Sequence, residues 1–141
     1  MSTTLYNRDI LRLAASIPHQ RRLEAPQASV EKRSHVCGSW VVVDVVLDDK
    51  GRVAEIGQEV RACAFGQASA ALMGAQVLGR RQHELAEVRD ALAAYLRGER
   101  DEPGDWPGLD TFAAARPHSA RHKAILLPFE AAAEAALKAG G

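Results

Sequence analysis

The chain has 141 residues, and its 18 lysines and arginines balance 18 aspartates and glutamates, so the formal net charge at pH 7 is zero. This length fits one domain, residues 1–141, with a core large enough to need neither disulfides nor a structural metal. The balanced charge gives no global field, which argues against a nucleic acid or a membrane surface as the partner.

The N-terminal residues lack the basic start and the apolar run of a signal peptide, and no apolar stretch approaches the ~18 residues of a membrane span. We therefore predict a cytoplasmic protein. Thiols stay reduced in the cytoplasm, which argues against a disulfide between the two cysteines of the chain.

Two elements are predicted before residue 35. Apolar residues in 6–15 recur mostly at helical spacing and Pro18 ends the pattern, which predicts a short amphipathic helix. Residues 28–33 predict an edge strand, because Val30 is β-branched and the charged residues after it discourage edge-to-edge pairing.

A β-hairpin is predicted next. The strand-like runs 40–47 and 52–62 flank the turn at residues 48–51 (DDKG), so Leu47 is expected to face Arg52. Pairing outward from this turn places Cys37 beside Ala62 and Cys63, at a strand spacing of about 5 Å. One side of this ribbon is expected to meet water.

Three helices follow the hairpin. The runs 64–78 and 83–96 predict helices that end at Gly79 and Gly98, and residues 99–108 predict a charged loop. The last helix is expected to start at residues 124–125 and to run to 138, because Pro128 fits the first turn of a helix better than its interior. We expect the helix carrying Leu72 and Met73 to cover the valine face of the hairpin.

The two cysteines at the open end of the hairpin suggest metal or cluster binding, sulfur transfer or a disulfide. Cys63 precedes a helix, whose N-terminal partial charge favours an anionic sulfur ligand. The alternative is a pair of buried cysteines that act as small hydrophobes. Two thiolates do not complete a tetrahedral sulfur site, so His35 and His122, on neighbouring loops, are the candidate additional ligands; each is otherwise a solvated loop histidine.

The order of these elements and motifs resembles the iron-sulfur cluster assembly scaffold family, the IscU, SufU and NifU N-terminal type. The resemblance covers nearly the whole chain. It rests on the early helix, residues 35–38 (HVCG), the turn at 48–51, residues 61–70 (RACAFGQASA) and residues 121–127 (RHKAILL). It implies an α+β fold, a small antiparallel three-stranded sheet with helices packed on one face.

The resemblance also implies a site. In the family, three cysteines and an aspartate or histidine hold a nascent iron-sulfur cluster or a zinc ion, and a cysteine desulfurase delivers the sulfur. Cys37 and Cys63 match the first two cysteines, whereas the family's aspartate is Ser39 here and its third cysteine maps to Ala124. His122 lies two places before Ala124 and is the candidate substitute ligand. The family's Leu-Pro-Pro-Val-Lys chaperone motif is replaced by residues 117–121 (PHSAR).

Three functions stay open on the sequence. The first is a scaffold, not an enzyme, that holds iron, zinc or a labile iron-sulfur cluster through Cys37, Cys63 and His122, with a homodimer sharing a cluster as one arrangement. Its partners would be the desulfurase and apo iron-sulfur acceptor proteins. The second is a degenerate paralogue that binds no metal and acts as a binding or regulatory module. The third is a persulfide relay through Cys63.

Overall fold

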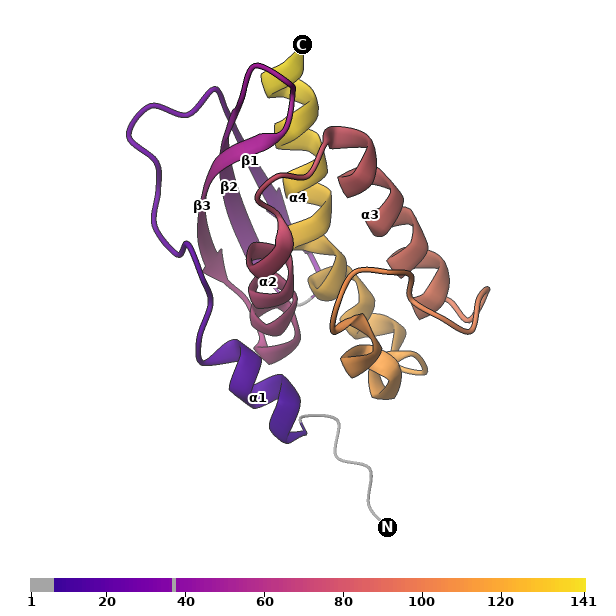
Figure 1. The fold of residues 1–141 in the computed structure, drawn as a ribbon. Coiled ribbons are helices and arrows are strands. Elements are labelled where there is room, and N and C mark those ends of the chain that lie inside the picture. Colours follow the sequence, from indigo (N-terminus) through magenta and orange to yellow (C-terminus); the bar gives the residue numbers. More distant parts are fainter. Residues whose placement is uncertain (1–6, 37) are drawn as a thin grey trace.

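The computed structural model describes residues 7–36 and 38–141. The elements in chain order are α1 (Arg8–Ala14), β1 (Ala28–Arg33), β2 (Trp40–Leu47), β3 (Val53–Arg61), α2 (Ala64–Gln76), α3 (Gln82–Leu96), the 3₁₀ helices η1 (Leu109–Ala115) and η2 (Ser119–Arg121), and α4 (His122–Gly140). Each predicted helix and strand is present, and η1 and η2 are additional (Figure 1). None of the described helices combines the length and the apolarity that crossing a membrane requires.

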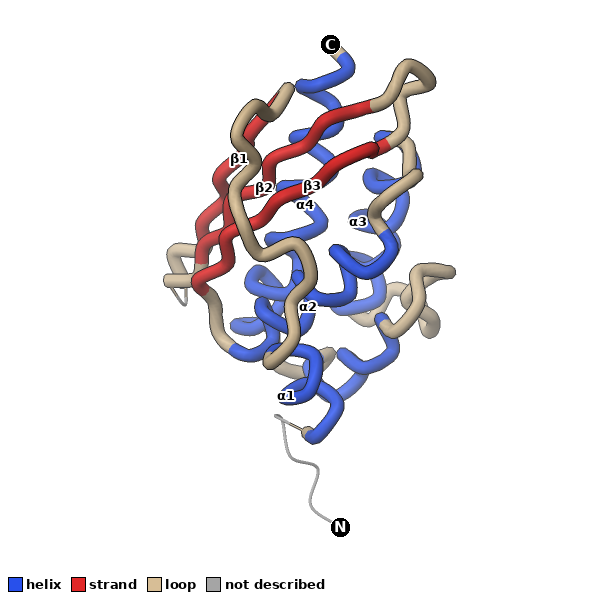
Figure 2. The backbone as a smooth tube through the Cα atoms, turned by 60° about the vertical axis from the view of Figure 1, so that its left-hand side comes forward, coloured by secondary structure: helices blue, strands red, loops and turns tan. Residues whose placement is uncertain are grey.

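The three strands form one antiparallel sheet in the order β1-β2-β3. Ala28 of β1 lies opposite Val45, and Trp40 of β2 lies opposite both Arg33 of β1 and Arg61 of β3. The three-stranded antiparallel sheet and the edge position of β1 are therefore confirmed. The helices lie on one face of this sheet (Figure 2).

The hairpin register differs from the prediction. Val43 lies opposite Gln58, two residues further along β3 than expected, and Leu47 lies opposite Val53 rather than Arg52. The carboxylate of Asp48 accepts hydrogen bonds from the backbone N–H groups of Lys50 and Arg52, each at 2.9 Å, which widens the turn, and a bulge follows Val46. Beyond the bulge the shift is two residues, an even number, so residues 40–46 keep the face that was predicted for them.

The inner face of the sheet is covered by α4, which packs on β1 and β2. The prediction that α2 covers the valine face is therefore wrong; α2 contacts α1, α4 and the edge strand β3, and α3 packs on α4. Small side chains let α4 approach the strands closely. The buried alanines of α4 are Ala124, Ala131, Ala132, Ala133, Ala135 and Ala136.

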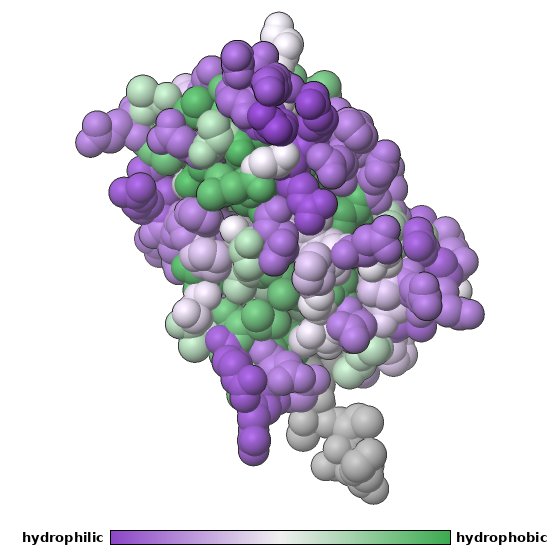
Figure 3. Space-filling model, viewed as in Figure 1, coloured by the Kyte–Doolittle hydropathy of each residue, from purple (hydrophilic) through white to green (hydrophobic). Residues whose placement is uncertain are grey.

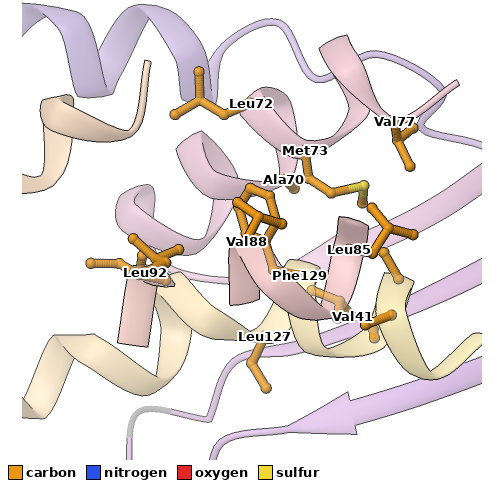
Figure 4. Close-up of a cluster of buried hydrophobic side chains, with 14 of the residues drawn as sticks. Val41, Ala70, Leu72, Met73, Val77, Leu85, Val88, Leu92, Leu127 and Phe129 are labelled. Carbon is orange, nitrogen blue, oxygen red and sulfur yellow. The ribbon is translucent and has the colours of Figure 1, made fainter. Parts of the chain in front are cut away.

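The hydrophobic core lies between the sheet and the helices. Figure 4 shows Val41 of β2, Met73 of α2, Leu85 of α3 and Phe129 of α4 in this core, and each of them is inaccessible to solvent. The predicted apolar stripe of α3 is buried as well. On the face seen in Figure 3, apolar residues are exposed over the middle of the molecule, where α2 lies, and hydrophilic residues surround them.

Helix α4 begins earlier than predicted, at His122, so Pro128 lies inside the helix and not in its first turn. Proline has no N–H, so the carbonyl of Ala124 loses its helical hydrogen bond. The next carbonyl, that of Ile125, accepts a hydrogen bond from the Ser69 hydroxyl at 2.5 Å, which ties α4 to α2. Burial of most of the apolar residues of α4 outweighs the single lost bond, and the helix continues through the proline.

Residues 15–27, here called the strap, cross the outer face of the sheet between α1 and β1 (Figure 2). The backbone N–H of Gln58 donates to the carbonyl of His19 at 2.9 Å, so the strap pairs with the edge of β3. A Cβ on Gly57 would lie 2.3 Å from the carbonyl oxygen of Arg21, which only glycine avoids. The strap therefore covers the middle of the face that we expected to meet water.

The strap is held by the buried carboxylate of Asp44. Arg22 donates to it through Nε at 2.8 Å and Nη2 at 3.1 Å, Leu23 donates its backbone N–H at 2.9 Å, and Ser29 donates its hydroxyl. Burial raises the pKa of Asp44, but the hydrogen bonds from Arg22, Ser29 and Leu23 together outweigh it, so the pKa lies below its ordinary value.

Candidate iron-sulfur assembly site

Cys63 lies at the junction of β3 and α2, where it is the N-cap residue of the helix. Its backbone is extended, with φ −64° and ψ 171°, and its carbonyl accepts the first helical hydrogen bond, from the N–H of Gln67 at 2.9 Å. The thiol is free and half-buried. The predicted position of Cys63 at a helix N-terminus is therefore confirmed.

Ser39, the residue just before β2, contacts Cys63. Its side chain is buried, and its hydroxyl oxygen accepts a hydrogen bond from the backbone N–H of Cys63 at 3.3 Å. The backbone N–H of Ser34 donates to the carbonyl of Ser39 at 2.8 Å, which closes the loop between β1 and β2. Ser39, which replaces the family's aspartate, is thus hydrogen-bonded to the backbone of Cys63.

Cys37, the other predicted thiol ligand, lies outside the described residues, and with it the predicted contact between the two cysteines. The neighbouring Gly38 has φ +73° and donates its N–H to the carbonyl of Ser34 at 3.0 Å. His35 is exposed on the same loop. The two loops that carry the cysteines in sequence therefore converge at Ser39 and Cys63.

Ala124 approaches the site from α4. It is fully buried, and a Cβ on Gly66, in the first turn of α2, would lie 3.7 Å from the Ala124 Cβ and 2.6 Å from the Ala62 Cβ. Gly66 therefore allows α4 to lie directly against the start of α2, three residues from Cys63. The position to which the family's third cysteine maps is next to the Cys63 turn, but alanine offers no ligand atom.

His122 begins α4, and its Nε2 lies 2.9 Å from the carbonyl oxygens of both Ala115 and Arg116. Because carbonyl oxygens only accept, Nε2 carries the hydrogen, and Nδ1 is the nitrogen with a lone pair for a metal. Among the residues that the structure describes, no three His, Cys, Asp or Glu side chains form a group able to hold a metal ion.

Sequence reasoning missed two features at this end of the sheet. The first is the Ser39 hydroxyl, which accepts a hydrogen bond from the N–H of Cys63. The signal for it was the position of this serine just before β2, because β2 pairs with β3 and β3 leads into α2. The second is the stacking of Arg33 and Arg61 on Trp40, which only the correct register reveals. Two surface grooves, of about 580 and 420 Å³, are lined by α3 and by loop 99–110, and neither includes Cys63.

No protein-family model matches the chain. A curated relative, the iron-sulfur cluster assembly scaffold protein IscU of Thermotoga maritima, is 25% identical over 134 residues, which are 95% of this chain and 94% of the relative. The crystal structure of a nitrogen-fixing NifU-like protein (N-terminal) from Brucella abortus is 34% identical with a TM-score of 0.89, and the match covers 96% of this chain and 94% of that one. The chain belongs to the IscU/NifU-like scaffold family.

The fold of this scaffold family is seen again at lower identity. A putative iron-sulfur cluster assembly scaffold protein for the SUF system from Fervidobacterium islandicum is 20% identical, with a TM-score of 0.85 over 94% of this chain and 96% of its own. Within the IscU/NifU-like family, this chain has one end where β2, β3, α2 and α4 meet around Cys63, with serine and alanine at two of the positions that the sequence resemblance assigns to ligands.

Proposed function

We propose that this chain is a cytoplasmic scaffold on which an iron-sulfur cluster is assembled, with Cys37, Cys63 and His122 as the protein ligands. The cluster is the cargo of the scaffold: a cysteine desulfurase supplies its sulfur, and apo iron-sulfur proteins receive it. The observation that carries the proposal is the placement of Cys63 at the N-terminus of α2, in a chain that belongs to the IscU/NifU-like family.

The hydrogen bonding of His122 supports its role. A histidine that binds a metal usually donates its other ring N–H to a carbonyl or carboxylate, which fixes the tautomer and the ring orientation. The carbonyls of Ala115 and Arg116 provide this arrangement for Nε2 and leave Nδ1 for iron or zinc. A histidine in place of the third cysteine would hold the cluster less tightly than a thiolate, which suits transfer to an acceptor.

Ser39 and Ala124 leave each chain with two thiols, so the alternative arrangement of this scaffold is a dimer in which two chains share one cluster, each contributing Cys37 and Cys63. Four thiolates then complete the ligand set of a two-iron cluster without a third cysteine in either chain. In this arrangement His122 would serve the single chain that holds iron or zinc before the cluster is built.

Anaerobic reconstitution with ferrous iron and sulfide tests the function. We expect a sulfide-to-iron charge-transfer absorbance in the visible range, which Cys37→Ala and Cys63→Ala each abolish and His122→Ala weakens. Elemental analysis and light scattering of the same sample give the metal per chain and the number of chains per cluster. A colourless and metal-free protein after this treatment would contradict the scaffold function.

A second candidate function is favoured by Ser39 and Ala124 themselves. A paralogue that has lost cluster assembly would still bind the desulfurase, as a regulatory module or as a persulfide relay through Cys63. Binding of the desulfurase by a Cys37→Ser/Cys63→Ser variant, together with failed reconstitution of the unmodified chain, would support the module. Mass spectrometry that finds one added sulfur on Cys63 after incubation with desulfurase and cysteine, without any retained iron, would support the relay.

A further inference from the structure

Three residues form a row across the outer face of the sheet, here called the arginine-tryptophan row: Arg33 of β1, Trp40 of β2 and Arg61 of β3. Trp40 is directly opposite both arginines in the register, so the three side chains share one face. The guanidinium carbon of each arginine lies 5.5 Å from the centroid of the Trp40 ring. One tryptophan thus holds two cations in place by cation–π contact.

The N–H donors of these arginines remain available. The side chains of Arg33 and Arg61 are 56% and 71% exposed. Arg33 uses Nε to bind Glu31 at 2.7 Å, and the Nε of Arg61 forms a long ion pair with the carboxylate of Glu59 at 3.9 Å, so the terminal nitrogens of both guanidinium groups are left for a ligand. Stacking on a ring leaves the donors at the edge of the guanidinium plane directed away from the ring, in the fork geometry that fits carboxylates.

The row borders the candidate site. Trp40 follows Ser39, and Arg61 lies two residues before Cys63, whereas the strap covers the outer face further along, at Asp44. Two residues further from Cys63 on the same face, Glu31 and Glu59 flank Val42. On the outer face, the basic residues are therefore nearer to Cys63 than the acidic ones. The described segments that meet there, residues 32–36, 38–40, 60–69 and 116–125, contain basic residues but no aspartate or glutamate.

We propose that the arginine-tryptophan row is the docking surface for an acidic segment, rich in aspartate and glutamate, of the protein that delivers sulfur to Cys63. This inference rests on the proposed function. In the delivery step, the Cys63 thiolate attacks the outer sulfur of the donor's cysteine persulfide; a new S–S bond forms on Cys63, the donor's S–S bond breaks, and the donor leaves as a thiolate, so no external oxidant is needed. The zero net charge of the chain favours this local contact over attraction of a long polyanion.

The test measures the rate of sulfur transfer to Cys63 from the desulfurase of the same organism in the presence of cysteine, followed by mass spectrometry. We expect Arg33→Glu/Arg61→Glu to slow transfer about tenfold at low salt, with the difference vanishing near 1 M salt, where charges are screened beyond about 3 Å. Poly-L-aspartate should slow the unmodified protein and leave the variant unaffected.

The chain offers a matched control in Arg97. Its Nε binds Glu99, two residues away, at 2.7 Å, and its side chain is 55% exposed, so it reproduces the setting of Arg33 at the end of α3. Arg97→Glu should transfer sulfur at the unmodified rate. Alkylation of Cys63 by uncharged iodoacetamide should be equal in all variants, which shows that the fold and the thiol are intact.

Two results would overturn the docking surface alone: equal transfer rates for the unmodified protein and the double variant at low salt, or competition by a DNA oligonucleotide as strong as that by poly-L-aspartate. A different result, no sulfur on Cys63 of the unmodified protein at any salt concentration, would overturn the sulfur-accepting function and the docking surface with it. Reconstitution with iron and inorganic sulfide needs no donor protein, so it reports on the cluster separately.

Discussion

The hydroxyl oxygen of Ser39 accepts a hydrogen bond from the backbone N–H of Cys63 at 3.3 Å, across the end of the β2-β3 pair. Through this bond the Ser39 side chain fixes the backbone of Cys63, whose thiol is a candidate ligand. Where the resemblance assigns a carboxylate to this position, this chain has a neutral hydroxyl that accepts a hydrogen bond from the backbone of Cys63.

Ser39→Ala removes this acceptor and leaves the N–H of Cys63 unpaired next to a buried side chain. We expect the free energy of unfolding to fall by about 1 kcal/mol, the usual net value of one such bond. Urea titration measures this, and Ser39→Thr, which keeps the hydroxyl, is the control. An unchanged midpoint for Ser39→Ala would mean that the bond contributes nothing to the start of α2.

Ser39→Asp/Ala124→Cys restores the two ligand types that the family has at these positions. Because Ala124 lies beside Gly66 in the first turn of α2, its thiol would be placed next to Cys63. We expect the double variant to bind Zn²⁺ at least about tenfold more tightly than the unmodified chain, as an added thiolate ligand should. Competition with a chromophoric chelator measures the affinity.

Ala132→Cys is the matched control for that experiment, because Ala132 is equally buried in α4 but lies two turns further along the helix. It adds a thiol without placing it near Cys63. Equal zinc affinity for the double variant and the control would mean that position 124 does not belong to the metal site.

Asp44→Asn tests the anchor of the strap. The pKa of Asp44 is lower in the folded chain than in the unfolded one, so the carboxylate stabilises the fold above its unfolded pKa of about 3.9 and loses this effect as pH falls through the lower, folded value. At pH 7 the variant should be less stable by about 2 to 4 kcal/mol, because the charged hydrogen bonds of Arg22 and Leu23 are lost or weakened.

The measurement is urea unfolding at pH 7, 5 and 3, and the difference between the two proteins should shrink at the lowest pH. Asp90→Asn, which removes only the exposed pair with Arg89, should change stability by less than about 1 kcal/mol. A constant difference across the pH series would show that the charge of Asp44 is not what holds the strap.

Val43→Ala tests the buried face of the sheet. Val43 is inaccessible to solvent beneath α4, so removing two methyl groups should cost on the order of 1 to 3 kcal/mol. Val46→Ala, at a half-buried position on the opposite face of the same strand, should cost less. Thermal unfolding of both variants gives the comparison, and an equal loss would show that the two faces are packed alike.

The positions of the strands were predictable because β2 and β3 are rich in β-branched residues and flank a recognisable turn; Val41, Val43 and Val45 are all buried on the inner face. Their register was not, because it depends on two hydrogen bonds of the Asp48 side chain and on a bulge, neither of which alters the hydrophobic pattern. Beyond the bulge the error is two residues, so the faces assigned to residues 40–46 were correct.

The last helix shows a different limit. The expectation that Pro128 must lie in the first turn placed the start of α4 too late. The packing of the whole helix against β1, β2, α2 and α3 compensates for the one hydrogen bond that the proline removes. At the site, the position of Cys63 before α2 followed from local sequence signals. The contact of Ser39 with Cys63 joins segments distant in sequence, so no local signal predicts it. The contact of His122 with Ala115 depends on the 3₁₀ helix η1, which the sequence pattern did not predict.

The strap has a consequence for how this protein meets copies of itself. A sheet of three strands has two open edges, and an unpaired edge is a template on which another chain adds a strand. The backbone N–H of Gln58, on the β3 edge, donates its hydrogen bond to the carbonyl of His19, so a segment of the same chain covers this edge. A second copy therefore finds the amide of Gln58 already paired, and the β3 edge offers it less of a template for strand addition than a bare edge would.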